Sequence, residues 1–265
     1  MLGNKRSKQL NINSRRLIFA ALISVFVIVG AVAAINILTT ERNYAAAQSE
    51  YTELRNLAPP PASAQTPQSP QTPDTTADSE QAETTAPQPD QTQEQAPRPD
   101  LTALNPDYLG WIRIEETNID YPVVWGVNNT KYLNTTFLGD RNPSGTIFMD
   151  NRSMGGFSGY AVLHGHNMRD GSMFAGLYNL LDPGFQNNEP EIEITTSYGE
   201  TFIFKVFDVS ITNVNDKVFT LLEENIDSVK SHFIARGISE NASILILSTC
   251  TTGHRDERLV VQAYR

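Results

Sequence analysis

The stretch ILILSTC, residues 244–250, decides the fold of this chain. Its uninterrupted aliphatic residues are typical of a buried β-strand, and the last residue of such a strand, Cys250, emerges at the edge of a sheet. Eight residues after Cys250, Arg258 opens a second apolar run, LVV at 259–261. If the two strands pair through the loop between them, the thiol and the guanidinium lie at the same end.

A third segment supplies imidazole groups. The sequence LHGHN at residues 163–167 ends another apolar run and carries His164 and His166. A lone cysteine with a histidine and an arginine from separate strands suggests a thiol nucleophile, a proton-transfer partner and an anion stabiliser. The competing interpretation is a small buried residue without chemistry, which is the usual state of a single cysteine.

The N-terminus indicates the compartment. Residues 1–16 carry five basic residues and no acid, and residues 17–38 form a 22-residue stretch whose only polar members are Ser24 and Asn36. This length predicts one transmembrane helix that acts as a signal-anchor. A cleaved secretory signal is the alternative, with Ala45-Ala46-Ala47 as its cleavage site. The basic tail favours a cytoplasmic N-terminus, which places everything after residue 40 outside the cell, at the membrane.

Residues 39–100 are predicted to form an extracellular, disordered linker. Ten of the fifteen prolines fall within residues 58–100, among Gln, Thr, Ala and Ser, and no aromatic residue is present there. Such a segment cannot bury enough apolar surface to offset the entropy lost on ordering. Residues 101–265 then form the folded domain, with 20 acidic and 12 basic residues and a net charge of −8. This charge argues against nucleic acid as a partner.

The domain is expected to be mostly β. Short apolar runs bounded by Gly, Pro, Asn or Asp predict strands, and residues 191–195 and 202–209 read as a hairpin. Helices are predicted at Ser172–Leu181 and at about Lys217–Arg236, where one apolar stripe recurs at spacings of three and four. The further strands are expected at residues 111–114, 119–125, 146–149 and 160–163. Eight or so strands with two inserted helices predict a closed or nearly closed β-barrel.

At this point the residues resemble a known family, the sortases, membrane-anchored cysteine transpeptidases of Gram-positive bacteria, and within it class B. The end of the strand, LSTC at 247–250, is similar to the family's Thr/Ser-x-Thr-Cys signature. The segments LHGHNMRDGSMF at 163–174 and DERLVV at 256–261 are similar to its histidine and arginine regions. The opening, LGWI at 109–112 with IDYPVV at 119–124, also matches, whereas Trp125 and Asn128-Asn129 depart from the common pattern.

The resemblance implies an eight-stranded sortase barrel and a sorting reaction. Cys250 would attack the carbonyl after the Thr of a pentapeptide near the C-terminus of a secreted protein, and the thioester would pass to an amine of peptidoglycan precursor or of a pilin. A neighbouring cation favours the thiolate that attack requires. His166 would exchange protons with the two amines, and Arg258 would hold the peptide and stabilise the oxyanion.

Several residues have rivals for these roles. His164 competes with His166, and the family pattern selects the histidine after glycine. Arg255 and Arg265 compete with Arg258, which alone immediately precedes the apolar strand. Further candidates bear on substrate and cofactors. Ser248 and Thr249 are candidates for substrate binding, and neither a metal cluster nor a cofactor motif is visible.

Two functions from other classes remain open at this stage. A hydrolytic cysteine peptidase would use the same thiol and imidazole but would release the acid. A catalytically silent surface-binding domain on a stalk would show no thiol reactivity toward a sorting peptide. The residues do not indicate the pentapeptide, the acceptor amine or the oligomeric state.

Overall fold

The computed structural model describes residues 12–62 and 100–265. They fall into two compact units, one that ends at Gln48 and one that runs from Ser49 to Arg265. Most of the predicted basic tail, up to residue 11, and the predicted linker from 63 to 99 lie outside the described residues.

The first unit is helical and belongs to α1 (Ile12–Arg55). The large apolar side chains of its Leu17–Leu38 stretch are exposed where they are described, so no protein core covers them. By length and composition this helix can cross a membrane, in agreement with the predicted span.

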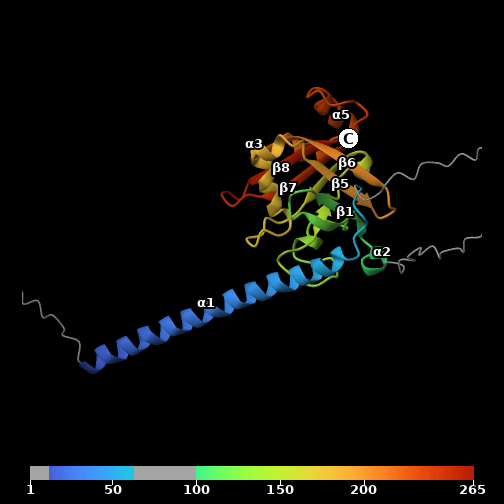
Figure 1. The fold of residues 1–265 in the computed structure, drawn as a ribbon. Helices are drawn as coiled ribbons and strands as arrows, with labels where there is room; N and C mark the ends of the chain where they lie inside the picture. The colour runs from blue at the N-terminus through green and yellow to red at the C-terminus, as the bar shows by residue number, and fades with distance from the viewer. Residues whose placement is uncertain (1–11, 63–99) are drawn as a thin grey trace, which may run out of the picture. The chain divides into compact units, whose positions relative to one another are not determined.

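The second unit is a closed barrel in the order β1-β2-β3-β4-β7-β8-β6-β5; Figure 1 shows its strands packed together, with β7 and β8 beside one another. This confirms the predicted closed eight-stranded fold. The hairpin expected near residues 191–209 is the antiparallel pair β5–β6. The strands are β1 (Tyr108–Ile114), β2 (Asp120–Val124), β3 (Ile147–Met149), β4 (Tyr160–His164), β5 (Glu191–Thr196), β6 (Thr201–Asn213), β7 (Ile244–Cys250) and β8 (Glu257–Tyr264).

Strand β7 is apolar without alternation because both of its faces are covered. It pairs in parallel with β4 and antiparallel with β8, and its first six residues are buried. Ile244 and Ile246 pack in one cluster with Val229 and Phe233 of α5 (Ile226–Ile234), outside the barrel wall. The intervening Leu245 is equally buried and, by the alternation of side chains along a strand, faces the barrel interior.

The predicted long helix at Lys217–Arg236 is wrong in its continuity. The structure has a short helix α4 (Lys217–Thr220), a 3₁₀ turn η5 (Leu221–Glu223) and then α5. The break occurs because Asn225 caps a new helix, its side chain accepting a hydrogen bond from Ser228 N at 3.0 Å. Part of the apolar stripe survives the break, since Leu222, Val229 and Phe233 are buried in one cluster with residues of β4 and β7, whereas Ile226 is 39% exposed.

The other helical segments are short. The helix predicted at Ser172–Leu181 is a 3₁₀ helix, η4 (Phe174–Leu181). The remaining segments are α2 (Leu101–Leu104), η2 (Lys131–Leu133), η3 (Gly156–Ser158) and α3 (Pro183–Gln186).

Residues 49–62 belong to the barrel unit, although the sequence analysis assigned them to the linker. Tyr51 and Leu54 are buried, and Ala62 N donates to the Glu193 carboxylate at 2.8 Å. The folded unit therefore begins upstream of the boundary predicted at Leu101. The error arose because a few anchoring side chains before a proline-rich stretch carry no periodic pattern.

Candidate active site

The predicted thiol and guanidinium lie side by side at the open end of two paired strands. Cys250 ends β7 and is exposed, and Arg258, near the start of β8, is its register partner. The loop between them folds back so that Thr251 N still donates a backbone hydrogen bond to the Glu257 carbonyl. The antiparallel pairing inferred from the sequence is therefore present, with the register that brings the two side chains together.

The histidine segment reaches the same end through β4. His164 is the register partner of Ser248, and Gly165 N donates to the Ser248 carbonyl at 3.2 Å. Two residues further, Asn167 Nδ2 donates to the Cys250 carbonyl at 3.1 Å. Gly165 is required at this crossing, since a Cβ there would lie 2.7 Å from the Phe174 ring.

The ring of His166 is oriented by a backbone carbonyl. Its Nε2 lies 2.6 Å from the oxygen of Leu133, so Nε2 carries the proton and donates it. In the neutral ring this leaves Nδ1 as the acceptor.

One pocket of about 310 Å³ brings all five predicted site residues together. The nucleophile, base and arginine candidates Cys250, His166 and Arg258 line it, as do Ser248 and Thr249. Among the described side chains, the hydroxyls of Ser248 and Thr249 are buried without a hydrogen-bond partner. A buried, unpaired hydroxyl costs about 1–3 kcal/mol, so these two groups are prepared for a polar ligand or water.

Arg258 contacts the backbone of the β7–β8 loop. Its Nη1 donates to the carbonyls of Arg255 and Glu257, each at 2.8 Å. The rival Arg255 does not line the pocket. The other rival, Arg265, lies at the far end of β8, with its guanidinium 3.8 Å from the centre of the Phe202 ring.

A carboxylate that the sequence analysis missed lies beside His164. The Asp150 side chain is 1% exposed; its Oδ2 lies 3.0 Å from His164 Nε2 and 2.9 Å from Arg152 Nη2. Burial by itself raises the pKa of Asp150, but hydrogen bonds from His164 and Arg152 outweigh it and hold this pKa well below its usual value. All three residues line the pocket. The available signal was a carboxylate directly after the predicted strand 146–149.

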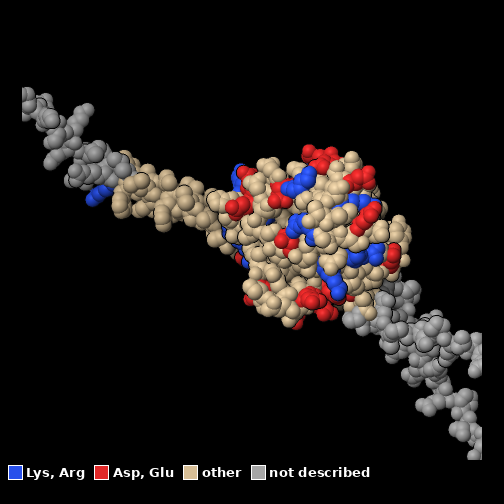
Figure 2. Space-filling model, turned by 90° about the horizontal axis from the view of Figure 1, so that it is seen from above, with Lys and Arg blue, Asp and Glu red and all other residues tan. Residues whose placement is uncertain are grey.

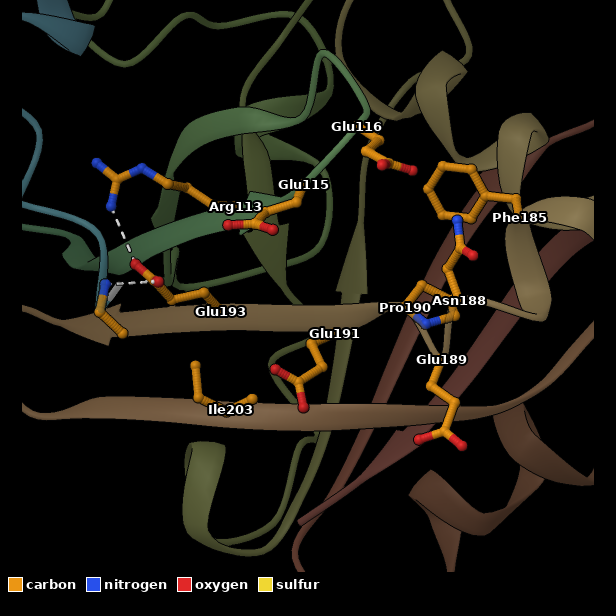
Figure 3. A pocket seen from close by; sticks show the side chains of 11 residues that line it. Arg113, Glu115, Glu116, Phe185, Asn188, Glu189, Pro190, Glu191, Glu193 and Ile203 are labelled. Atoms are coloured by element: carbon orange, nitrogen blue, oxygen red, sulfur yellow. Dashed lines mark hydrogen bonds and ion pairs between the residues drawn. The ribbon is translucent and has the colours of Figure 1, made fainter. Parts of the chain in front are cut away.

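The domain has a second, larger concavity with a different character. A groove of about 630 Å³ lies over β1 and β5 and is lined by Glu115, Glu116, Glu189 and Glu191, while Glu193 pairs with Arg113 at 3.0 Å (Figure 3). It contains none of the predicted catalytic residues. Within residues 12–62 and 100–265, no group of three His, Cys, Asp or Glu is placed to hold a metal ion.

Charge on the visible face of the molecule is mixed. Figure 2 shows Lys and Arg interspersed with Asp and Glu over this face of the domain, with no continuous basic stripe.

Comparisons with known proteins identify the family. A family model described as "Sortase domain" matches residues 112–265. Sortase B of Listeria monocytogenes is 32% identical over 179 residues, covering 61% of this chain and 71% of the relative.

Solved structures agree. A class B sortase of Streptococcus pyogenes involved in pilus biogenesis has a TM-score of 0.56 and 28% identity, covering 62% of this chain and 95% of that one. A Staphylococcus aureus sortase B–substrate complex has a TM-score of 0.54 and 27% identity, covering 62% of this chain and 82% of that one. The chain belongs to the sortase family, and the resemblance is to class B.

Proposed function

We propose that this class B sortase is a cysteine transpeptidase that cleaves a C-terminal sorting signal of secreted proteins and joins the new carboxyl end to an amine. The observation that carries the proposal is the pocket in which Cys250, His166 and Arg258, from three separate segments, meet. A thiol, an imidazole and a guanidinium supply the nucleophile, the proton carrier and the oxyanion donor that acyl transfer requires.

In the first half-reaction the Cys250 thiolate attacks the carbonyl carbon after the Thr of the sorting pentapeptide. The C–N bond breaks, the thioester forms, and the leaving amine takes a proton from His166. In the second half-reaction an acceptor amine gives a proton to His166 and attacks the thioester. An amide forms and the Cys250 thiolate is regenerated, so atoms and charge balance over the cycle.

Arg258 is proposed to stabilise the oxyanion. One of its nitrogens, Nη1, is already engaged with loop carbonyls. The guanidinium has further N–H donors, which can serve the anionic oxygen while Nη1 keeps the side chain in place. A lysine could not perform both tasks with the same geometry.

Ser248 and Thr249 are proposed to bind the peptide. Their hydroxyls are buried, lack partners among the described residues and line the pocket beside the nucleophile. A peptide whose polar groups pair with them would remove the cost of leaving them unpaired.

The proposed location is the cell membrane, as a single-pass protein with a cytoplasmic N-terminus and an extracellular barrel. The basic residues before Leu17 and the apolar stretch of α1 support this orientation. The acceptor amine would then come from peptidoglycan precursor or from a pilin, and no metal or cofactor enters the proposed reaction.

The experiment uses the full chain in detergent micelles with quenched fluorescent peptides that contain Thr, drawn from C-terminal regions of secreted proteins of the same genome. Triglycine and hydroxylamine serve as probe amines, and Cys250→Ala is the control. We expect an acyl adduct on Cys250 by intact mass and an amide product whose yield rises with amine concentration.

Two outcomes would contradict the proposal. Cleavage that yields acid alone, whatever the amine concentration, would indicate a hydrolytic peptidase. Absence of any adduct or cleavage across the peptide set, with hydroxylamine present, would indicate a silent binding domain.

A further inference from the structure

The segment of residues 49–62, which we call the docking segment, is bonded to the barrel along its length. Glu50 accepts a hydrogen bond from Leu138 N at 2.9 Å, and Arg113 donates to the carbonyl of Pro59. Tyr51, the one aromatic residue among residues 49–62, is 3% exposed. The segment is thus an integral part of the folded unit.

The hydroxyl of Tyr51 contacts the loop that holds the ring of His166. It donates to the Gly145 carbonyl and lies 3.2 Å from Thr146 Oγ1. Thr146 lines the active-site pocket together with Leu133. The Leu133 carbonyl is the group that orients the His166 ring. The Tyr51 hydroxyl is therefore linked to the imidazole through the single loop that contains Leu133, Gly145 and Thr146.

Close backbone packing around Gly145 makes the loop that Tyr51 contacts rigid. Gly145 has φ of +59°, and a Cβ there would lie 2.4 Å from the Tyr132 carbonyl. Thr146 N donates to the same Tyr132 carbonyl at 3.0 Å. Since Leu133 follows Tyr132 directly, a shift at Gly145 is transmitted to the carbonyl that faces His166.

The ring of Tyr51 contacts a second support of His166. It packs edge-on against Tyr121, with ring centres 5.3 Å apart. The Tyr121 hydroxyl accepts a hydrogen bond from Met173 N at 3.1 Å. Met173 is a non-glycine residue at φ +56°, and the next residue, Phe174, donates from N to the His166 carbonyl at 2.9 Å.

Arg55 reinforces this second support. Its guanidinium lies 4.9 Å from the centre of the Tyr121 ring, and its Nε donates to the Asp120 carbonyl at 3.1 Å. A cation over an aromatic face is attractive, and here it adds to the contacts that hold Tyr121 of β2 in place.

We propose that Tyr51 is a positioning residue of the active site. Its hydroxyl fixes the loop that orients the His166 ring, and its ring fixes the tyrosine that supports the His166 backbone. The end of α1 thereby sets the geometry of the imidazole, beyond tying the barrel to the chain that precedes it. The consequence for turnover rests on the proposed function, whereas the consequence for the geometry of His166 does not.

The test compares Tyr51→Phe with Tyr160→Phe in the full chain in detergent micelles. Both replacements remove a buried tyrosine hydroxyl that donates to a backbone carbonyl, of Gly145 in the first case and of Val218 in the second. Tyr160 belongs to the cluster under α5. It therefore controls for loss of stability without contact to the supports of His166.

The first measurement is the ring NMR signals of ¹⁵N-histidine-labelled protein across pH. The chain has four histidines, and His166→Gln assigns the signal. We expect Tyr51→Phe to shift the Nε2 signal of His166, and Tyr160→Phe to leave it unchanged. Unchanged His166 signals in folded Tyr51→Phe would overturn the proposal, even if the protein were less stable.

The second measurement is steady-state turnover of a cleaved peptide. We expect kcat to fall about tenfold in Tyr51→Phe with KM nearly unchanged, because small misplacement of a reacting group costs up to about a hundredfold in rate. A shift of the His166 signal in a protein that turns over no peptide would leave the positioning role intact and refute the proposed function. Normal turnover with an unshifted signal would refute the positioning role alone.

Discussion

Replacing Asp150 with asparagine tests the network that joins its buried carboxylate to His164 and Arg152. The carboxylate accepts from Arg152 Nε at 3.0 Å and Nη2 at 2.9 Å, from Arg152 N at 3.0 Å, and pairs with His164 Nε2 at 3.0 Å. An asparagine keeps one acceptor oxygen, but its NH₂ group replaces the second oxygen and faces N–H groups that had donated to that oxygen. About two charge-assisted hydrogen bonds are lost.

The magnitude follows from these contacts. A hydrogen bond to a charged group contributes about 1.5–3 kcal/mol, which gives roughly 3–6 kcal/mol for two. The Arg152 side chain is 42% exposed, so solvent screening reduces its share. We expect Asp150→Asn to lower the free energy of unfolding by about 2–3 kcal/mol at pH 7, equivalent to roughly 4–12 °C in Tm for a domain of this size.

The loss should depend on pH in a defined direction. The folded-state pKa of Asp150 lies below the ordinary 3.8. Its stabilising contribution is therefore complete above about pH 4 and disappears as the pH falls toward the folded-state pKa. The difference between the native protein and Asp150→Asn should be largest at neutral pH and shrink in acid.

Urea unfolding followed by tryptophan fluorescence measures this difference. Both tryptophans, Trp111 and Trp125, lie in the barrel unit, so the signal does not depend on α1. Asp227→Asn is the matched control, because Asp227 is exposed, and it should change stability by less than about 0.5 kcal/mol. Equal stability of Asp150→Asn and the native protein at pH 7, or a difference that grows below pH 4, would refute this reasoning.

Three further predictions concern the proposed catalytic groups. Cys250→Ala should abolish acyl-adduct formation, yet change the unfolding free energy by less than about 0.5 kcal/mol because the thiol is exposed; adduct formation on this variant, seen by intact mass, would contradict the assignment. His166→Ala should lower kcat by about a hundredfold to ten-thousandfold and His164→Ala by far less, measured by steady-state cleavage, and the reverse order would exchange their roles. Arg258→Lys should lose most single-turnover acylation, on a scale of about 3–4 kcal/mol for an oxyanion donor, whereas Arg255→Ala should be nearly silent; near-normal acylation without the guanidinium would remove Arg258 from the site.

The barrel and the thiol–arginine pair were predictable because local pattern determines them. A buried strand that ends in Cys250 and a second that has Arg258 near its start can pair across a short loop in few ways. The apolar stripe before β7 did not reveal that the predicted long helix is broken. Asn225 caps a new helix there, while the spacing of the apolar residues stays the same. A capping side chain competes with helix continuation at a single residue, which periodicity over twenty residues does not detect.

The supports of His166 could not be predicted for a different reason. Tyr51 meets Gly145 across a separation of 94 residues, and neither belongs to a repeating pattern. The carboxylate of Asp150 meets His164 only because β3 and β4 are adjacent in the closed sheet. Contacts of this kind depend on the complete topology, so they become visible only once the strand order is known.

The choice between the two histidines, left to a family pattern at the level of sequence, now has a geometric argument. His164 is level with Ser248, two residues before Cys250, which at about 3.3 Å per residue places it some 6–7 Å back along the strand direction. Its Nε2 is occupied by the Asp150 carboxylate. His166 lies beyond the strand end, next to Asn167, whose side chain reaches the Cys250 carbonyl. Along the chain, residue 166 therefore lies nearer the level of Cys250 than residue 164 does, while the ring at 164 is paired with the Asp150 carboxylate.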